Sequence, residues 1–349
     1  MTGERPRYLK VWVVAGVVVV LAFGFWVAVF GLASPRKPVA TGRVAPPPAA
    51  CTVHADVSQL PVVEPGDVVC LSGTLDSRLV ISTGGTPVRP ITYTGDGNTT
   101  VRGIDVTASN VVVQGFTAAE AHSMGAKLQG NNIVFQNNTI THPVNAGDDT
   151  DGIRFFGDHI KMLHNWISDV SDGSHCSKDG CGDGPHPDCF QTFYSNEYPT
   201  SSDITIDGNH CEKVAAQCLI AEGPNLPEQG IHGPGESANW TVSNNYCDDD
   251  AAQAMMIRDI KNVSITNNDF EGKNNKAIAL ADASTGAHVD GNKLGKHVPK
   301  LITFDDNTVS SGYVGPKPDT SGASDSGSNS DNDSDSDSSD SDSGGDSDH

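Results

Sequence analysis

Pairs of apolar residues two positions apart, each pair followed three positions later by an asparagine, recur along most of this chain. The first full example has Ile133 and Phe135 as the apolar pair, Asn138 as the asparagine and Ile140 as a further apolar residue. A spacing of two is that of a β-strand with one buried face. Six later segments repeat the pattern: Ile160, Met162, Asn165, Ile167; Ile204, Ile206, Asn209, Cys211; Trp240, Val242, Asn245, Cys247; Val263, Ile265, Asn268, Phe270; Ala287, Val289, Asn292, Leu294; and Ile302, Phe304, Asn307, Val309.

The intervals between these asparagines indicate what kind of fold the strands build. Successive asparagines lie 27, 44, 36, 23, 24 and 15 residues apart, by subtraction of their positions. Repeats of this size without helical periodicity build a solenoid, in which each unit buries its core against the next. Seven asparagines in register predict a ladder of side-chain amides at a turn. We therefore predict an all-β fold, a right-handed parallel β-helix, over residues 51–314.

A second strand recurs in each predicted coil, and its period of two separates an inner from an outer face. The inward positions are apolar except for one threonine: Ile153, Phe155, Phe190, Thr192, Leu219, Ala221, Met255, Ile257, Ile278 and Leu280. The outward positions form two columns, the first made of Arg154, Gln191, Ile220 and Met256 and the second of Phe156, Phe193, Glu222 and Arg258. Parallel stacking predicts that these columns form one continuous face, suited to a long polymeric ligand.

Two coils are longer than the others, which predicts loops that wall this face. One insertion, residues 171–188, is rich in Gly, Asp and His, and the other spans residues 223–237. Insertions in a solenoid become loops on one side of the stack. Both are expected to converge on the coils that contain Asp151 and Asp188.

The ends of the chain differ in composition from the repeats. Residues 11–33 carry no charge, follow a basic stretch at residues 1–10 and are long enough to span a bilayer. Residues 34–50 are rich in Pro and Ala and predict a stiff linker, while the Ser/Asp-rich tail at residues 315–349 predicts disorder. We expect a signal-anchor that makes this a single-pass cell-membrane protein with its β-helix outside the cytoplasm. Cleavage near Ala33 and secretion is the alternative.

Charge excludes one class of partner. The chain of 349 residues has a formal net charge of −22, of which ten Asp after Lys317 supply −10, so the remainder is −22 + 10 = −12. A nucleic-acid-binding surface would be basic, so we expect no nucleic-acid partner. The low aromatic content of 6% and the 37 Gly fit a turn-rich solenoid.

All eight cysteines follow the apolar segment, which suggests export to an oxidising compartment. Stacked positions in adjacent coils lie about 4.8 Å apart, within the range of disulfide Cα separations. The repeat alignment predicts four pairs: Cys51 with Cys70, Cys176 with Cys181, Cys189 with Cys218, and Cys211 with Cys247. A free buried cysteine at position 211 is the alternative.

Candidate chemistry gathers where two of the outward-facing strands begin. Asp148, Asp149 and Asp151 precede one strand, and His186 and Asp188 precede the aligned strand of the next coil. Equivalent groups in adjacent coils lie about 4.8 Å apart, close to the separation of about 5–5.5 Å between the two carboxyls of retaining glycosidases. Repulsion between such carboxylates raises a pKa or recruits a cation.

Three interpretations of this acidic cluster are open. Asp151 and Asp188 would be the acid/base pair of a hydrolase. Asp148 and Asp149, with backbone carbonyls, would instead hold Ca²⁺, although no cofactor is required by the pattern. The acidic side chains would otherwise only make hydrogen bonds in turns.

A lyase would need a different set of groups. It requires a cation to neutralise a uronate carboxylate and a base to remove the C5 proton. Arg154 or Arg258 are the candidate cations, and His186 or Lys261 are the candidate bases.

Short strings in these coils resemble polygalacturonase motifs, and residues 51–314 as a whole are similar to the pectin-lyase-like superfamily. Asp149-Thr150-Asp151-Gly152 looks like Asn-Thr-Asp-Gly, Pro187-Asp188-Cys189 looks like Asp-Asp-Cys, and Arg258-Asp259-Ile260-Lys261 looks like Arg-Ile-Lys. The resemblance implies a β-helix, a polysaccharide substrate and Asp151 as the motif's acid. The chain departs from it where Asp149 replaces Asn, Pro187 replaces the first Asp, and Gln217-Cys218-Leu219 replaces Gly-His-Gly.

Three classes of function therefore compete. The first is a surface-tethered enzyme, a lyase or glycoside hydrolase, that acts on polysaccharide. The second is a glycan-binding protein that stacks sugars on Phe156 and Phe193, with Gln191 and Glu222 as polar neighbours. The third is a structural surface protein. The sequence leaves the oligomeric state open.

Overall fold

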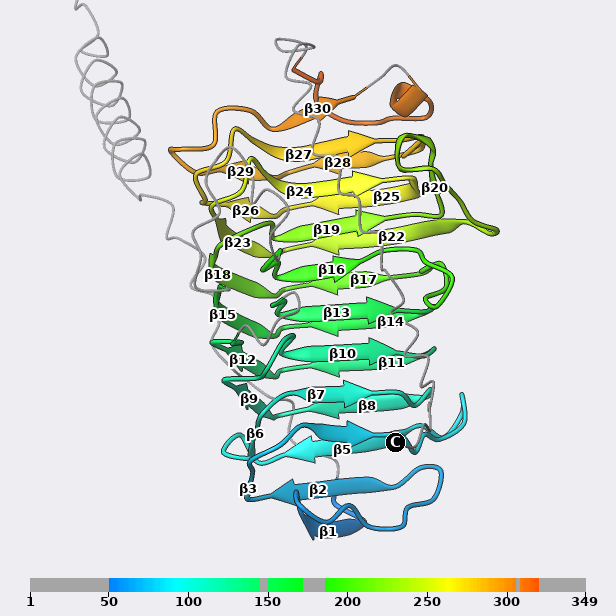
Figure 1. The fold of residues 1–349 in the computed structure, drawn as a ribbon, viewed down its shortest axis with the longest axis vertical. Helices are drawn as coiled ribbons and strands as arrows, with labels where there is room; N and C mark the ends of the chain where they lie inside the picture. The colour runs from blue at the N-terminus through cyan, green and yellow to red at the C-terminus, as the bar shows by residue number, and fades with distance from the viewer. Residues whose placement is uncertain (1–49, 145–149, 172–185, 306–307, 320–349) are drawn as a thin grey trace, which may run out of the picture. The chain divides into compact units, whose positions relative to one another are not determined.

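The computed structural model describes residues 50–144, 150–171, 186–305 and 308–319. The predicted membrane segment, linker and most of the acidic tail lie outside these residues. Among the residues that are described, no helix is long and apolar enough to cross a bilayer. The strands instead stack into a parallel β-helix with three sheets, as predicted (Figure 1).

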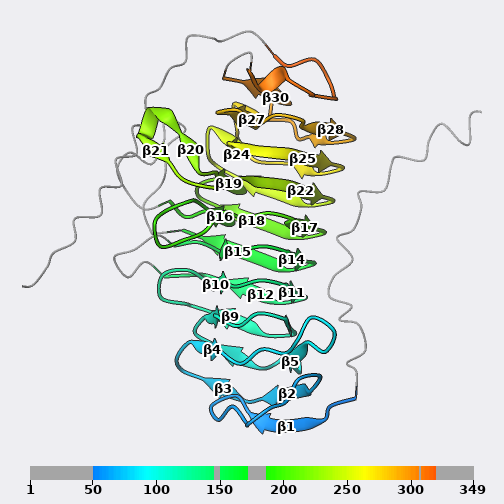
Figure 2. The same ribbon diagram turned by 90° about the vertical axis from the view of Figure 1, so that its right-hand side faces the viewer.

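After the first strand, which belongs to sheet A alone, each coil contributes one strand to each sheet, in the order sheet A, sheet B, sheet C (Figure 2). Sheet A contains β1 (Val53–Asp56), β2 (Val68–Ser72), β5 (Ile91–Gly95), β8 (Val111–Gln114), β11 (Ile133–Gln136), β14 (Ile160–Leu163), β17 (Thr205–Asp207), β22 (Ser237–Ser243), β25 (Ile260–Thr266) and β28 (His288–Asp290). Sheet B contains β3 (Thr74–Leu75), β6 (Thr100–Val101), β9 (Thr117–Ala119), β12 (Thr139–Thr141), β15 (Trp166–Val170), β18 (His210–Val214), β23 (Tyr246–Asp249), β26 (Asp269–Phe270) and β29 (Lys293–Leu294).

Sheet C follows sheet B in every coil and carries the candidate site. Its strands are β4 (Leu79–Ile81), β7 (Ile104–Val106), β10 (Ala126–Gln129), β13 (Ile153–Phe156), β16 (Phe190–Thr192), β19 (Leu219–Glu222), β24 (Gln253–Arg258), β27 (Lys276–Ala281) and β30 (Ile302–Phe304). A short antiparallel hairpin, β20 (Asn225–Leu226) and β21 (Ile231–His232), flanks the 3-10 helix η1 (Pro227–Gln229). A second 3-10 helix, η2 (Thr308–Ser310), follows the last strand.

The core is a column of aliphatic and aromatic side chains that the three sheets enclose. Every predicted inward residue of sheet C is buried, as are the apolar pairs of sheet A from Ile133 and Phe135 to Ile265. Removing such side chains from water contributes roughly 1.5–3 kcal/mol each. Because each coil covers the core of the next, no coil is stable alone.

The predicted asparagine ladder is present between sheets A and B. Asn138, Asn165, Asn209, Asn245, Asn268 and Asn292 follow one another, and Asn307 lies outside the described residues. In each step the backbone N–H and the side-chain Nδ2 of one asparagine donate to Oδ1 of the next, as from Asn165 to Asn209 at 2.9 and 3.0 Å. The same Nδ2 also donates to a strand carbonyl of the preceding coil, for Asn209 that of Met162 at 2.9 Å. The ladder therefore ties three coils together at every step.

Each corner of the coil also carries a column of residues with positive φ. At the corner between sheets A and B the residue before each ladder asparagine adopts the left-handed conformation, as Gly208 does before Asn209. A left-handed residue turns the chain sharply and favours Gly, Asn and Asp. The three columns are Gly115, Asn137, His164, Gly208, Asn244, Asn267 and Gly291; Gly103, Glu120, His142, Asp169 and Lys213; and Asn110, Asn132, His159, Asp203, Asn239, Asn262 and Gly286.

Three rings stack on the outer face of sheet B. Trp166, His210 and Tyr246 occupy the same register position in three successive coils. The ring centroids of Trp166 and His210 are 3.8 Å apart, and those of His210 and Tyr246 are 4.4 Å apart, with nearly parallel planes in both pairs. The rings therefore face one another along the stack and turn their edges toward solvent.

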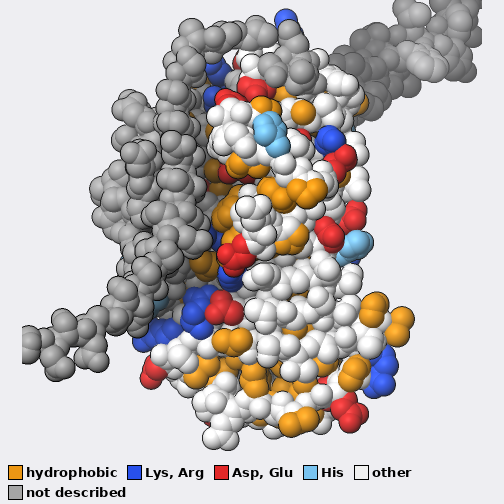
Figure 3. Space-filling view, turned by 45° about the vertical axis from the view of Figure 1, so that its right-hand side comes forward, with side chains coloured by type: hydrophobic (Ala, Val, Ile, Leu, Met, Phe, Trp, Pro, Cys, Tyr) orange, Lys and Arg blue, Asp and Glu red, His pale blue; other side chains and the backbone are white. Residues whose placement is uncertain are grey.

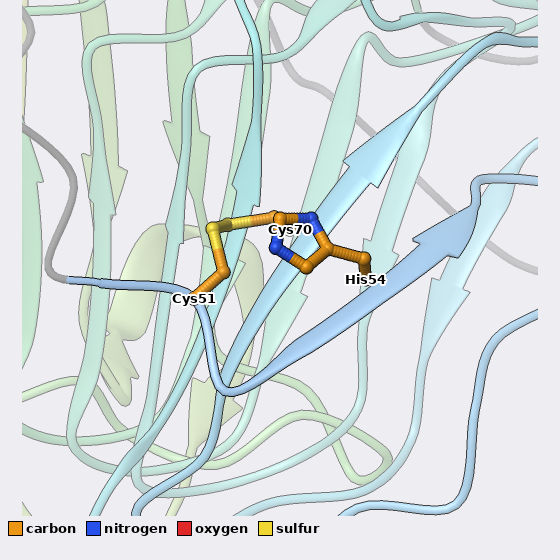
Figure 4. A group of neighbouring side chains, drawn as sticks. All are labelled: Cys51, His54 and Cys70. Atoms are coloured by element: carbon orange, nitrogen blue, oxygen red, sulfur yellow. A yellow bond between two sulfur atoms is a disulfide. The ribbon is translucent and has the colours of Figure 1, made fainter.

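Disulfides confirm one predicted pairing and correct two. Cys51 bonds Cys70 as expected, beside the exposed ring of His54 (Figure 4). Both sulfurs are used in that bond, so this group of side chains offers no thiolate to a metal. Cys176 and Cys181 lie outside the described residues.

The other two disulfides connect different partners from those we predicted. Cys189 bonds Cys211 with a Cα separation of 6.1 Å, and Cys218 bonds Cys247 with a Cα separation of 5.8 Å. The predicted pairs, Cys189 with Cys218 and Cys211 with Cys247, are wrong. In-register cysteines of a parallel ladder project side by side, whereas a disulfide needs Cβ atoms that converge. Cysteines of sheets B and C converge across the interior corner, each bond joining one coil to the next.

Candidate functional site

The outer face of sheet C carries the predicted columns of side chains, one per coil. Arg154, Gln191, Ile220 and Met256 are in register, as predicted. The same column extends toward the N-terminus through Lys127 and Asp105. Glu222 and Arg258 are also register partners in the second column. The N-terminal part of the first column is therefore polar and charged, and its C-terminal part, Ile220 and Met256, is apolar.

A loop after β16 covers part of the second column. Tyr198 stacks on Phe156 with ring centroids 3.9 Å apart, and Phe193 meets both rings edge-on. Phe156 is fully buried, so our expectation that it offers its ring to a sugar is wrong. The loop rather than a ligand occupies its face. Phe193 is half-buried, and the Arg154 guanidinium lies 5.6 Å from its ring centroid.

The second insertion packs against this loop and extends the wall. The backbone N–H of Tyr194 donates to the carbonyl of Glu222 at 3.1 Å. Gly233 lies so close to Tyr194 that a Cβ added there would fall 2.2 Å from the ring. The β20–η1–β21 hairpin, which lies in the predicted second insertion, and the loop after β16, which the sequence did not predict as a wall, thus lie in contact beside sheet C. The middle of the other insertion, residues 172–185, lies outside the described residues.

Asp151 and Asp188 lie in adjacent coils, as predicted, but both are fully buried. Asp151 Oδ1 accepts the backbone N–H of Asp188 at 3.2 Å, and Asp188 Oδ1 accepts the backbone N–H of Gln217 at 2.6 Å. Asp151 Oδ2 also bonds the Nε and terminal nitrogen of Arg154 at 2.8 and 2.6 Å. These carboxyls therefore connect the starts of three sheet C strands, the role described by our turn interpretation. Acid/base use of the pair stays a prediction.

The remaining predicted site residues are dispersed. His186 is half-buried, and its carbonyl accepts the N–H of Asp188. Lys261 lies on β25 of sheet A rather than on sheet C, and its Nζ bonds Glu236 at 2.8 Å. Asp148 and Asp149, our candidate Ca²⁺ ligands, lie outside the described residues.

Arg258 is the centre of an ionic cluster under the hairpin. Its three guanidinium nitrogens bond Asp282 at 2.6 Å, Glu222 at 3.3 Å and Glu228 at 2.9 Å. A hydrogen bond with Asp282 raises the pKa of Glu228, and repulsion from the same carboxylate adds to the effect. Carboxylate oxygens of Glu228, Asp282 and Asp305 also lie within 4.8 Å of one another. Arg258 already supplies positive charge to this cluster.

A cavity that sequence reasoning missed lies where sheet B turns into sheet C. Its volume is about 530 Å³, and Asp76, Arg78, Arg102, Glu120, His122 and His142 are among the residues that line it. Arg78 bonds Asp105, a member of the sheet C column, so the cavity adjoins that column. No motif links these residues, because they come from four different turns. The one available signal was two histidines that follow aligned sheet B strands of adjacent coils.

A buried carboxyl away from this face has a strongly perturbed environment. Burial raises the pKa of Asp249 well above its usual value of 3.8, against an opposing hydrogen bond from Asn274. Asp249 Oδ2 and Asn274 Oδ1 are both buried, and neither has a hydrogen-bond partner in the described part of the chain. A proton on Asp249 would allow its hydroxyl to donate to an acceptor, which an ionised carboxylate cannot do.

We expect this carboxyl to make stability depend on pH. Because its folded pKa is raised, its contribution is fully present below the unfolded value near 3.8 and is lost as pH rises through the folded pKa. Asp249→Asn should therefore raise the urea midpoint more at pH 8 than at pH 4. The exposed neighbour Asp250→Asn is the control and should change little. Equal shifts for Asp249→Asn at both pH values would refute the expectation.

Comparison with known proteins supports the architecture. Residues 102–310 match the family described as the right handed beta helix region. No curated protein matches the chain. Among solved structures, it is similar to pectate lyase Pel9A, with 11% identity and a TM-score of 0.46, over 74% of this chain and 70% of that one.

Two further similarities concern proteins of different kinds. A mutant of the PL6 family alginate lyase AlyGC is 13% identical with a TM-score of 0.45, over 69% of this chain but only 38% of that one. The Streptococcus pneumoniae surface protein and adhesin PfbA is 12% identical with a TM-score of 0.39, over 72% of this chain and 89% of that one. The chain thus spans well under half the length of the alginate lyase.

Proposed function

Because the chain belongs to the family of proteins with a right handed beta helix region, we propose that it is an exported protein that binds a polysaccharide along the outer face of sheet C. One observation carries this proposal. A column of polar side chains, Asp105, Lys127, Arg154 and Gln191, repeats once per coil beside a wall of loops. A linear polymer presents hydrogen-bonding groups at regular intervals and matches such a face.

The polar groups of this column are suited to hydroxyl groups. Lys127 Nζ donates to Tyr198 at 2.9 Å and retains further hydrogens to donate. Gln191 Oε1 is buried and has no hydrogen-bond partner among the described residues. An unpaired buried acceptor costs about 1–3 kcal/mol, which a donor from a ligand or a water would offset.

Binding without catalysis accounts for the geometry better than a hydrolase centred on Asp151 and Asp188. Both carboxyls are withdrawn from solvent and bonded to the backbone of the neighbouring coil. A general acid must come within hydrogen-bond reach of the substrate, and these two do not face the polymer in this arrangement. A lyase or hydrolase remains the second candidate, because His122 and His142 line an open cavity beside the face.

Export is supported by the disulfides that join the coils, since such bonds persist in oxidising compartments. We propose further that residues 11–33 anchor the protein in the cell membrane and that residues 34–50 hold the β-helix away from it. The acidic tail would keep the exposed surface hydrated.

Lys127→Ala is expected to weaken polysaccharide binding about tenfold, because one charge-assisted hydrogen bond contributes roughly 1.5 kcal/mol. The full chain, in detergent, would be titrated calorimetrically with plant, algal and bacterial polysaccharides. Lys273→Ala, an exposed lysine outside the sheet C column, is the matched control. Ultraviolet absorbance and reducing ends would be followed in the same samples, so that a catalytic product would be seen. Equal affinities of the two variants, or no binding to any polymer, would contradict the proposal.

A further inference from the structure

The cations around the sheet C face are already paired with carboxylates. Arg78 binds Asp105 through Nε at 2.8 Å and a terminal nitrogen at 2.7 Å, and its remaining nitrogen donates to the carbonyl of Met124 at 2.8 Å. Arg102 forms an ion pair with Glu120 at the mouth of the corner cavity. In Figure 3 most of the visible Lys and Arg side chains likewise lie beside Asp or Glu.

The two arginines proposed from the sequence to neutralise a uronate are engaged in the same way. Arg154 bonds one oxygen of Asp151 through two nitrogens, and Arg258 bonds three carboxylates. The guanidinium groups of both are largely withdrawn from solvent, at 12% exposure. Releasing either one to a ligand would leave a buried carboxylate without its partner, which is costly.

The balance of charge on this face is negative. Lys127 has no carboxylate partner within the described residues; it bonds the hydroxyl of Tyr198 instead. Among the described residues that line the cavity or form these ion pairs, together with Lys127, five cations, Arg78, Arg102, Lys127, Arg154 and Arg258, stand against seven carboxylates, Asp76, Asp105, Glu120, Asp151, Glu222, Glu228 and Asp282. A polyanion laid along the column would meet like charge, which disfavours that partner.

We propose that the ligand of this face is a neutral, hydroxyl-rich polysaccharide rather than a polyuronate, and that the corner cavity seats one of its sugar units. The inference rests on the proposed function and names the chemical class of its ligand. A guanidinium–carboxylate pair offers donors and acceptors side by side, which matches neighbouring hydroxyls of a sugar. Arg102 and Glu120 form such a pair in the cavity, and the exposed imidazoles of His122 and His142 add further donors and acceptors. Its volume of about 530 Å³ lies within the range of small-molecule sites.

The test compares hexasaccharides that differ only in whether C6 carries a hydroxyl or a carboxylate. The matched pairs are β-1,4-mannan and β-1,4-mannuronan, β-1,4-glucan and β-1,4-glucuronan, and α-1,4-galactan and α-1,4-galacturonan. Each would be titrated calorimetrically into the full chain in detergent, with EDTA and separately with Ca²⁺, at low and high salt. We expect the neutral member of at least one pair to bind about tenfold more tightly than its uronate, with little salt dependence.

A variant with altered charge gives a second, independent readout. Asp105→Asn combined with Glu120→Gln frees the guanidinium groups of Arg78 and Arg102 while keeping the size of both side chains. We expect its affinity for mannuronan to rise about tenfold and to become salt-sensitive. Circular dichroism would establish whether the variant folds. If it does not fold, the comparison of neutral and uronate hexasaccharides on the wild type tests the inference by itself.

The outcomes separate this inference from the proposed function. A uronate that binds the wild type as tightly as its neutral partner or more tightly, with or without Ca²⁺, overturns the inference and leaves polysaccharide binding standing. Absence of binding to every saccharide in these pairs and to the wider polysaccharide panel overturns both.

Discussion

Asn209→Ala is expected to lower the free energy of unfolding by about 3–5 kcal/mol, a large loss for a single substitution. Asn209 donates through Nδ2 to the Met162 carbonyl and to Asn245 Oδ1, and its own Oδ1 accepts from the backbone and side chain of Asn165. Alanine removes all four bonds and leaves buried partners that water does not reach. Urea denaturation followed by far-ultraviolet circular dichroism measures the loss.

Asn275→Ala provides the matched control. Asn275 is exposed and lies outside the ladder, so the same substitution there should change stability by less than about 0.5 kcal/mol. Asn292→Ala should have an intermediate effect, since it is the last asparagine of the ladder in the described chain and is only partly buried. Similar losses at positions 209 and 275 would show that the ladder does not stabilise the solenoid.

Removing a core disulfide by Cys218→Ala with Cys247→Ala is expected to cost about 3–4 kcal/mol. The bond closes a separation of 29 residues, and the chain-entropy model gives about this value for a loop of that length. The loss should appear as a lower midpoint in urea without a change of fold. An unchanged urea midpoint would mean that contacts between neighbouring coils keep the denatured chain as compact without this bond as with it.

The disulfides should also differ in how fast a thiol reductant opens them in the native state. Cys51–Cys70 is half-buried at the first coil, whereas Cys189–Cys211 and Cys218–Cys247 are enclosed by the core. Thiol–disulfide exchange requires access to a sulfur, so dithiothreitol should open the first bond well before the other two. Alkylation followed by peptide mass mapping distinguishes them, and simultaneous opening would contradict the buried placement.

Much of the fold was predictable because the β-helix repeats one local rule in every coil. Apolar residues at a spacing of two assign the inner face, and a single asparagine marks the same turn each time. The register of Arg154 with Gln191, and of Glu222 with Arg258, followed from that rule. Errors arose where a side chain's direction depends on a neighbouring coil or loop.

Two such errors concern the disulfides and Phe156, and the direction of Asp151 and Asp188 stayed open for the same reason. Aligned cysteines occupy equivalent positions in adjacent coils, but a disulfide also requires Cβ atoms that converge. A sequence alignment gives no information on the direction of the Cα–Cβ bonds. Phe156 has the outward position that its period assigns, yet a loop some forty residues later covers it with Tyr198. Asp151 and Asp188 begin their strands, where period two allows either face, and backbone donors of the next coil hold them inside.

The residues that line the corner cavity could not be predicted from the sequence, for a different reason. Arg78, Arg102, Glu120 and His142 are far apart along the chain and belong to no motif. Stacking of the coils alone brings them together. Their predictable feature was only that each falls at or next to the turn from sheet B to sheet C.

The distances between the stacked rings on sheet B depend on how far apart the coils lie. Trp166, His210 and Tyr246 each come from a different coil, so the gap between their planes follows the rise of the solenoid. Tension along the axis would separate the rings as soon as the coils part, while a load across the axis would leave them in contact. The surroundings of one indole therefore record the direction of a mechanical load as well as its presence.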